Sequence, residues 1–220
     1  MNDHPTLGGQ IRPPASGGKP KQIVLFLHGV GADGRDLIGL SRVFDVVLPD
    51  AVFVSPNAPF AFDMAPVGYQ WFAIGTFSPD RRLRGVREAA PILDAYIDEL
   101  LADYGLEEKD MVLVGFSQGT MMALHVGLRR EKPLAGIVGY SGVLAGAELL
   151  KDEIRSRPPV LLVHGDADMV LPAENLPAAV AALEAVGVPV EGHLRPGLGH
   201  GIDEEGLRLG RAFLSRVFGR

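Results

Sequence analysis

The sequence contains no cysteine in its 220 residues. This absence excludes disulfides, thiolate metal ligands and a cysteine nucleophile, and it fits a cytoplasmic protein. Positive charge is also scarce, because 21 Lys and Arg face 27 Asp and Glu for a net charge of −6. The composition therefore gives no reason to expect nucleic-acid binding. We interpret the one local basic run as a solvated helix face. It comprises Arg81, Arg82, Arg84 and Arg87.

Long apolar runs and cofactor motifs are absent as well. No uninterrupted apolar stretch approaches the ~18 residues that a membrane-spanning helix needs. The N-terminal "MNDHPTLGGQIRPPASGGKPK" lacks the basic-then-apolar order of a signal peptide. The sequence contains neither a dinucleotide-binding glycine fingerprint nor a histidine and carboxylate cluster with metal-ligand spacing. We expect a cytoplasmic protein with no membrane insertion, no metal and no organic cofactor. Whether it forms a homo-oligomer is left open by the sequence.

Short apolar runs rich in β-branched residues predict strands that are buried on both faces. They cover residues 23–27, 51–55, 111–115, 134–140 and 159–164, with a weaker candidate at 188–194. Three-and-four spacing of apolar residues between these runs predicts helices. The predicted helices cover 86–104, with Pro91 in a first turn or at a kink, 176–183 before Gly187, and 207–217 after the N-cap Asp203. Alternating strands and helices predict an α/β fold with a mainly parallel sheet and helices on both faces.

The domain organisation is expected to be simple. No internal repeat or composition break marks a second domain, so residues 1–220 are predicted to form a single domain without a large lid domain. About the first 20 residues are rich in Pro and Gly, and they form either a disordered extension or an edge hairpin. The segment 57–79 has no clear periodicity and contains aromatic residues, which favours an ordered functional loop.

The stretch "VGFSQGT" joins a predicted strand to a predicted helix and matches the pattern G-x-S-x-G. Such a serine lies on a sharp turn with strained backbone geometry. The positions two residues before and after it must be small, so that the strand and the helix can approach each other. Because the motif has the structural context that it requires, we predict Ser117 to be a nucleophile.

A serine hydroxyl needs a base, and the base needs an acid that orients it. In the fold that carries this motif the acid and then the histidine follow the serine along the chain. Asp168 follows a buried strand and is the preferred acid, while its rival Asp166 is expected to shape the turn. His200, in the Gly-rich "RPGLGHGIDEE", is the preferred base. The other histidines are in the tail, out of order or within a strand, and they are His4, His28, His125, His164 and His193.

Two backbone N–H groups should stabilise the oxyanion. One belongs to Gln118 at the start of a helix, and the other to Val30 in the loop after residues 23–27. A phosphate cradle is the alternative for this Gly-rich loop, but the required glycine spacing is missing. Ser141 in "GYSGV" provides an internal comparison. With Val143 in place of the second glycine, we interpret Ser141 as a strand end without an equally tight turn.

Six motifs in order resemble the carboxylesterase/phospholipase branch of the α/β-hydrolases, which includes acyl-protein thioesterases and lysophospholipases. They are "LFLHGVGADG", "SPNAP", "QWF", "GFSQG", "HGDADMVLP" and "GLGHGI", and the resemblance covers about residues 10–218. It implies an α/β-hydrolase fold and ester hydrolysis. The roles that it implies are Ser117 as nucleophile, His200 as general base and acid, Asp168 as its partner, Val30 and Gln118 as oxyanion hole, and Trp71 and Phe72 as pocket wall.

Three residues depart from the family pattern. Thr120 replaces a frequent glycine, Ala73 a frequent acidic residue and Met169 a frequent proline. None belongs to the triad, but all three are expected to line or neighbour the substrate pocket, and Met169 joins its candidate residues. For Trp71, core packing is as good an interpretation as a place in the pocket wall.

We therefore expect a serine carboxylesterase that hydrolyses small-molecule carboxylic esters through an acyl-enzyme intermediate. A long-chain acyl thioesterase or a lysophospholipase is the alternative within the same chemistry. A non-catalytic binding module on this fold is the alternative from another class. A dienelactone-type hydrolase is disfavoured because its usual cysteine nucleophile is missing.

Overall fold

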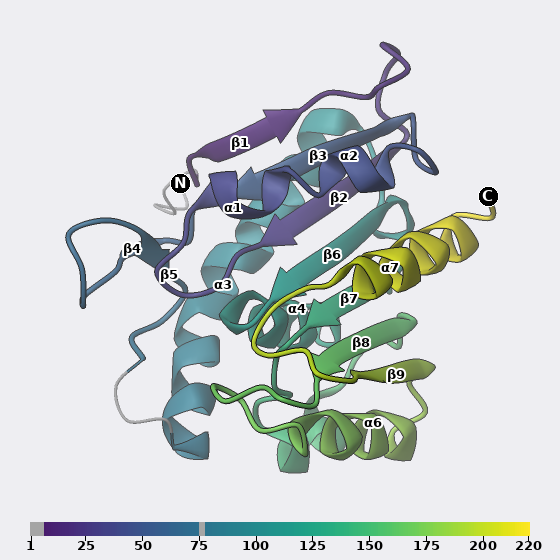
Figure 1. The fold of residues 1–220 in the computed structure, drawn as a ribbon. Coiled ribbons are helices and arrows are strands. Elements are labelled where there is room, and N and C mark those ends of the chain that lie inside the picture. The colour runs from purple at the N-terminus through teal and green to yellow at the C-terminus, as the bar shows by residue number, and fades with distance from the viewer. Residues whose placement is uncertain (1–6, 75–77) are drawn as a thin grey trace.

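The computed structural model describes residues 7–74 and 78–220, and a seven-stranded sheet forms its centre (Figure 1). The strand order is β1-β3-β2-β6-β7-β8-β9, and only β1 runs antiparallel to its neighbour. The strands are β1 (Gly9–Arg12), β2 (Gln22–Leu27), β3 (Ala51–Pro56), β6 (Met111–Phe116), β7 (Gly136–Tyr140), β8 (Val160–Gly165) and β9 (Val190–Arg195). Residues 1–6, which include His4 and begin the predicted N-terminal extension, lie outside the described residues.

Helices cover both faces of this sheet. They are α1 (Gly34–Ile38), α2 (Ser41–Phe44), α3 (Pro79–Tyr104), α4 (Gln118–Gly127), α5 (Leu150–Glu153), α6 (Asn175–Ala185) and α7 (Glu204–Val217). A small hairpin of β4 (Phe60–Ala61) and β5 (Tyr69–Gln70) projects from the loop after β3 (Figure 1). Two short 3-10 helices span Glu108–Asp110 and Ala147–Leu149.

Alternate residues of the central strands enter two separate apolar cores. Ile23 of β2 belongs to a core that contains buried residues of α3, α4, α5 and α6. Its neighbour Val24 belongs to a second core, on the other face, with buried residues of α1, α2 and α7. These cores explain why the strands are apolar along their whole length, and they confirm the predicted mainly parallel sheet with helices on both faces.

The N-terminal segment and α3 differ in detail from the sequence-based alternatives. Residues 9–12 are extended, as the edge alternative requires, but they pair with β3 and do not form a hairpin with β2. Pro91 lies inside α3, which begins at Pro79, so the first-turn alternative is wrong. The predicted N-cap of the last helix is confirmed, because Asp203 accepts a hydrogen bond from the N–H of Gly206.

The topology places the candidate site. Because the carboxyl ends of parallel strands meet at one edge of a sheet, the loops after β2, β6, β7 and β8 lie together (Figure 1). These loops carry Val30, Ser117, Ser141 and Asp168. Within residues 7–74 and 78–220, no helix has both the length and the apolar character needed to cross a membrane.

Candidate active site

Ser117 occupies the sharp turn between β6 and α4. Its backbone has φ 53° and ψ −114°, a conformation that is uncommon for any residue except glycine. A Cβ atom at Gly119 would overlap the carbonyl oxygen of Leu27, and one at Gly115 would meet the backbone of Gly119. The predicted reason for the two glycines is therefore confirmed: strand and helix approach so closely that no side chain fits between them.

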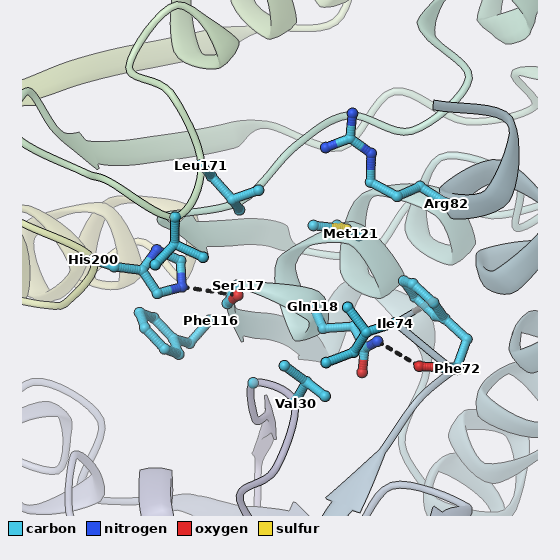
Figure 2. A pocket seen from close by; sticks show the side chains of 12 residues that line it. Val30, Phe72, Ile74, Arg82, Phe116, Ser117, Gln118, Met121, Leu171 and His200 are labelled. Atoms are coloured by element: carbon cyan, nitrogen blue, oxygen red, sulfur yellow. Dashed lines mark hydrogen bonds between the residues drawn. The ribbon is translucent and has the colours of Figure 1, made fainter. Parts of the chain in front are cut away.

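A chain of hydrogen bonds connects Ser117, His200 and Asp168. The His200 Nε2 atom lies 3.0 Å from Ser117 Oγ, and its Nδ1 atom lies 2.7 Å from Asp168 Oδ2 (Figure 2 shows the first of these). An ionised carboxylate only accepts hydrogen bonds, so Nδ1 carries the ring proton and Nε2 is left to accept the serine hydroxyl. The arrangement can withdraw a proton from Ser117 as the oxygen attacks a carbonyl.

Asp168 is held as an ionised acceptor. Burial of its side chain, which is 0% exposed, by itself raises the pKa. The N–H groups of Leu171 and Val170 donate to Oδ1 at 2.9 and 2.8 Å, and His200 donates to Oδ2. These bonds outweigh burial and hold the pKa of Asp168 below its usual range, so the carboxylate stays charged at neutral pH.

The rival carboxylate does not reach the histidine. Asp166 accepts a 2.7 Å hydrogen bond from the N–H of Gly197, so it fastens the loop after β8 to the loop after β9. Its role is structural, as predicted, although it holds a neighbouring loop and not only its own turn. His193 lies in β9 as expected. His28 is buried at the start of the loop that carries Val30, and its Nε2 accepts from the N–H of Ala58.

Ser141 fixes the loop that carries His200. It follows the end of β7, as predicted, and its Oγ donates a 3.0 Å hydrogen bond to the carbonyl oxygen of Gly201. The expectation that Val143 relaxes the turn is wrong, because Ser141 has φ 46° and is fully buried. Close packing maintains the strained backbone of Ser141, because a Cβ atom at the next residue, Gly142, would overlap the side chain of Thr120.

Two residues beside Ser117 have backbone N–H groups without an acceptor among the described residues. Val30 lines the cavity beside Ser117, and Gln118 is the first residue of α4, where helical N–H groups have no partner in the helix. Across the described chain, neither N–H donates to another residue. Both remain free for a developing oxyanion.

The side chain of Gln118 has a task that the motif did not reveal. Its Oε1 accepts from the N–H of Trp71 at 2.7 Å, and its Nε2 donates to the carbonyl of Phe72 at 2.8 Å (Figure 2 shows the second of these). The side chain is buried and both of its polar ends are satisfied. Gln118 therefore fastens the segment after β5 to the start of α4.

A cavity of about 180 Å³ opens beside Ser117 and His200. Its wall is mostly apolar and comes from the loop after β2, the segment after β5, α4 and the loop after Asp168. The apolar side chains are Val30, Phe72, Ile74, Phe116, Met121, Val170 and Leu171. One charged side chain that the sequence did not single out joins them: Arg82 of α3 (Figure 2).

Two of the three predicted pocket residues do not line this cavity. Trp71 is fully buried behind the wall, where its Nε1 donates to the carbonyl of His28 at 3.1 Å, so the core interpretation is the correct one. Met169 is 94% exposed, because it lies on the outer side of a loop whose next two residues face inward. Phe72 does line the cavity.

The other two departures from the family pattern lie beside the cavity without lining it. Thr120 is buried against Gly139 and Gly142, and its Oγ1 donates to the carbonyl of Tyr140 at 2.9 Å. Ala73 is exposed between two lining residues. Neither contributes to the wall, but Ala73 adjoins Phe72 and Ile74, and Thr120 adjoins Met121. Both therefore neighbour the cavity, which is one of the two expected positions.

Some of the residues that line the cavity could have been predicted from the sequence, and others could not. Met121 lies four residues after Ser117, one helical turn further along α4, so helical spacing could have found it. Leu171 donates its N–H to Asp168 and could have been placed beside it. Nothing in the sequence separates Arg82 from its exposed neighbour Arg81. Among the residues that the structure describes, no group of three or more His, Asp or Glu is arranged to hold a metal ion.

Several known proteins are similar to this chain over most of its length. The phospholipase/carboxylesterase family matches residues 13–218. Esterase YpfH of Escherichia coli is 28% identical over 86% of this chain and 80% of its own. Acyl-protein thioesterase 1 of Neurospora crassa is 32% identical over 87% and 85%. The crystal structure of esterase PE8 superposes with a TM-score of 0.93 at 43% identity, over 96% of this chain and 99% of that one. The chain is thus a hydrolase with the α/β-hydrolase fold and belongs to the phospholipase/carboxylesterase family.

Proposed function

We propose that the protein is a serine carboxylesterase that hydrolyses small carboxylic esters through an acyl-enzyme intermediate. The observation that carries this proposal is the continuous hydrogen-bond chain from Ser117 through His200 to Asp168, which ends beside an apolar cavity. Family membership supports the same reaction class.

In the first step Ser117 Oγ attacks the ester carbonyl while His200 Nε2 takes its proton. Negative charge develops on the carbonyl oxygen, where the N–H groups of Val30 and Gln118 are proposed to donate. A donor that is already oriented costs no reorganisation during the reaction, and removal of one such donor costs about 3–4 kcal/mol in other serine hydrolases. Asp168 stabilises the imidazolium that forms.

The second half of the reaction uses the same groups. His200 gives its proton to the leaving alcohol, which departs and leaves the acyl group on Ser117. A water molecule then loses a proton to His200 and attacks the acyl carbonyl. The products are the carboxylic acid and the alcohol, and Ser117 regains its hydrogen.

The test compares the wild type with Ser117→Ala on p-nitrophenyl butyrate. We expect kcat/KM to fall about 10⁴-fold or more, because the chemical step loses its nucleophile. Labelling with a fluorophosphonate probe should occur in the wild type and be absent in Ser117→Ala. A wild type that neither turns over esters nor takes the label would instead indicate a binding module.

A matched pair of variants tests whether Asp168 is the acid that orients His200. Asp168→Asn should lower kcat by about 10³–10⁴-fold, because the amide favours the wrong tautomer of His200. Asp166→Asn makes the same chemical change two residues away and should cost less than about 10-fold, since it weakens one loop contact. Equal losses in the two variants would contradict the assignment of Asp168.

A long-chain acyl thioesterase or lysophospholipase is the second candidate, favoured by the similarity to acyl-protein thioesterase 1. The size of the cavity favours short acyl groups, because 180 Å³ is close to the ~150 Å³ of an apolar cavity that holds one benzene molecule. A series of p-nitrophenyl esters and matching thioesters with acyl chains from two to sixteen carbons separates the two. A maximum of kcat/KM beyond about ten carbons would favour the second candidate.

A further inference from the structure

Arg82 is an unusual member of the cavity wall. It lies in the first turns of α3 and is half-buried. Between residues 7 and 74 and between 78 and 220 it has no hydrogen bond or ion-pair partner for its guanidinium, whereas Arg87, further along the same helix, pairs with Glu153. A half-buried guanidinium loses hydration without a compensating partner, so an anion that entered the cavity would be favoured there.

The surroundings of Arg82 do not supply that anion. Val170 and Leu171 separate the cavity from a shallow depression that Arg82 also borders, and both side chains are apolar. Glu174 lies in the depression, but no carboxylate of the described chain comes within 4.0 Å of the Arg82 guanidinium. The cationic group is therefore available at the end of an otherwise apolar wall.

The position of Arg82 relative to the reacting atoms decides which part of an ester it can meet. Figure 2 shows His200 and Phe116 on one side of Ser117, and Met121, Phe72 and Arg82 on the other. In ester hydrolysis His200 must protonate the leaving alcohol, so the alcohol lies on the histidine side. The acyl group then extends past Met121 toward Arg82.

From these observations we propose that Arg82 binds a carboxylate at the far end of the acyl group, so that the enzyme acts preferentially on half-esters of short dicarboxylic acids. The apolar wall accommodates the methylene chain, and the guanidinium donates two N–H bonds to the terminal carboxylate in a bidentate pair. Water adds to the half-ester to give the dicarboxylate, the alcohol and one proton. This inference rests on the proposed function and names its substrate class.

The experiment measures kcat/KM by pH-stat for pairs of ethyl esters with equal acyl length. Monoethyl succinate, glutarate and adipate are compared with ethyl butanoate, pentanoate and hexanoate. The readout is the kcat/KM of each half-ester divided by that of the neutral ester of equal acyl length. A ratio is compared between variants because the net charge of −6 disfavours every anion to a similar extent. In Arg82→Gln the ratio of the two kcat/KM values for the best-fitting pair should fall about 10-fold relative to the wild type.

The matched control is Arg81→Gln, which removes the same charge one residue earlier from an exposed side chain that does not line the cavity. It should leave the ratio within about 2-fold, because an exposed charge is screened by solvent. Arg82→Lys should retain part of the preference. Equal ratios in the wild type, Arg82→Gln and Arg81→Gln would overturn the inference.

Three further outcomes are decisive. Carboxymethyl hexanoate carries its carboxylate on the alcohol, and a loss in Arg82→Gln confined to this ester would overturn the acyl-side assignment. If the wild type hydrolyses the neutral esters and rejects every half-ester, the inference fails and the proposed function stands. If Ser117→Ala retains turnover of neutral and charged esters alike, the proposed function itself fails.

Discussion

The buried side chain of Gln118 allows a test of how the pocket wall is held. The perturbation is Gln118→Met, which keeps the length and the unbranched shape of the side chain but removes both polar atoms. The backbone N–H of residue 118, the proposed oxyanion donor, is retained. Two backbone groups lose their partners: the N–H of Trp71 and the carbonyl of Phe72.

The magnitude follows from the burial of these groups. Trp71 and Phe72 are 0% and 5% exposed, so water cannot readily replace the lost bonds. Each buried polar group without a partner costs about 1–3 kcal/mol, which gives about 4 kcal/mol for the pair. For a protein of this size, 1 kcal/mol corresponds to about 2–4 °C, and we expect Tm to fall by about 8–16 °C. The loosened wall should also raise KM for esters.

Gln70 supplies the control. It is buried like Gln118, but its Oε1 has no hydrogen-bond partner within the described residues. Gln70→Met therefore removes an amide whose oxygen makes no hydrogen bond in the folded state. The free energy of unfolding should change by less than about 1 kcal/mol or increase. Calorimetry and urea unfolding of both variants provide the assay. Equal loss of stability in Gln118→Met and Gln70→Met would refute the reasoning.

Three further predictions concern the support of the site. Ser141→Ala removes the hydrogen bond to the carbonyl of Gly201, and kcat on p-nitrophenyl butyrate should fall about 5- to 10-fold with KM little changed. Burial lowers the pKa of His125 from its ordinary value of 6.5 to about 4. The unfolded chain therefore binds this proton first as the pH falls, and the free energy of unfolding in urea should decrease by about 2 kcal/mol from pH 7 to pH 5. Gly119→Ala should lower Tm by about 6 °C or more and abolish activity, because its Cβ overlaps the carbonyl oxygen of Leu27.

Each of these predictions has a contradicting outcome or a control variant. A rise of KM with unchanged kcat in Ser141→Ala would argue against a role in placing the His200 loop. His125→Gln should make stability less dependent on pH between 5 and 7, and an unchanged slope would assign the dependence to other groups. Gly39→Ala places a Cβ in open space and should leave Tm within about 2 °C, in contrast to Gly119→Ala.

The catalytic arrangement could be predicted from the sequence because chain order and strand ends determine it. Buried parallel strands are recognisable as apolar runs, and the residues that follow them must meet at one edge of the sheet. This argument placed Ser117 and Asp168 near each other without any knowledge of the helices. His200 followed from its Gly-rich loop and its position after the acid, and the structure brings all three within hydrogen-bond distance.

The pocket wall could not be predicted in the same way, because it depends on side-chain direction in segments without periodicity. Trp71 and Phe72 are adjacent in an irregular segment, and one faces the core while the other faces the cavity. Met169 and Val170 differ in the same manner in the loop after β8. Arg82 lines the cavity only because α3 begins beside the site, a tertiary relation that its local sequence does not encode.

The same few residues hold both the catalytic groups and the wall, and this couples the reaction to substrate choice. Asp168 uses Oδ2 for His200 and Oδ1 for the N–H groups of Val170 and Leu171, which line the cavity. The backbone N–H of Gln118 is likewise the proposed oxyanion donor, while its side chain fixes the segment with Phe72.

Substitutions at these two residues should therefore change kcat and acyl-chain preference together, whereas Arg82 touches only the far end of the wall. If Asp168→Ala, which removes both oxygens, lowered kcat equally for acyl chains of two and eight carbons, the Oδ1 contacts would have no part in shaping the cavity. Asp168→Asn is a different case. Because an amide oxygen still accepts hydrogen bonds, the preference should shift only where the amide turns its NH₂ group toward Leu171. The chain-length profile of Asp168→Asn thus reports which way that amide lies, in a way that its kcat alone does not.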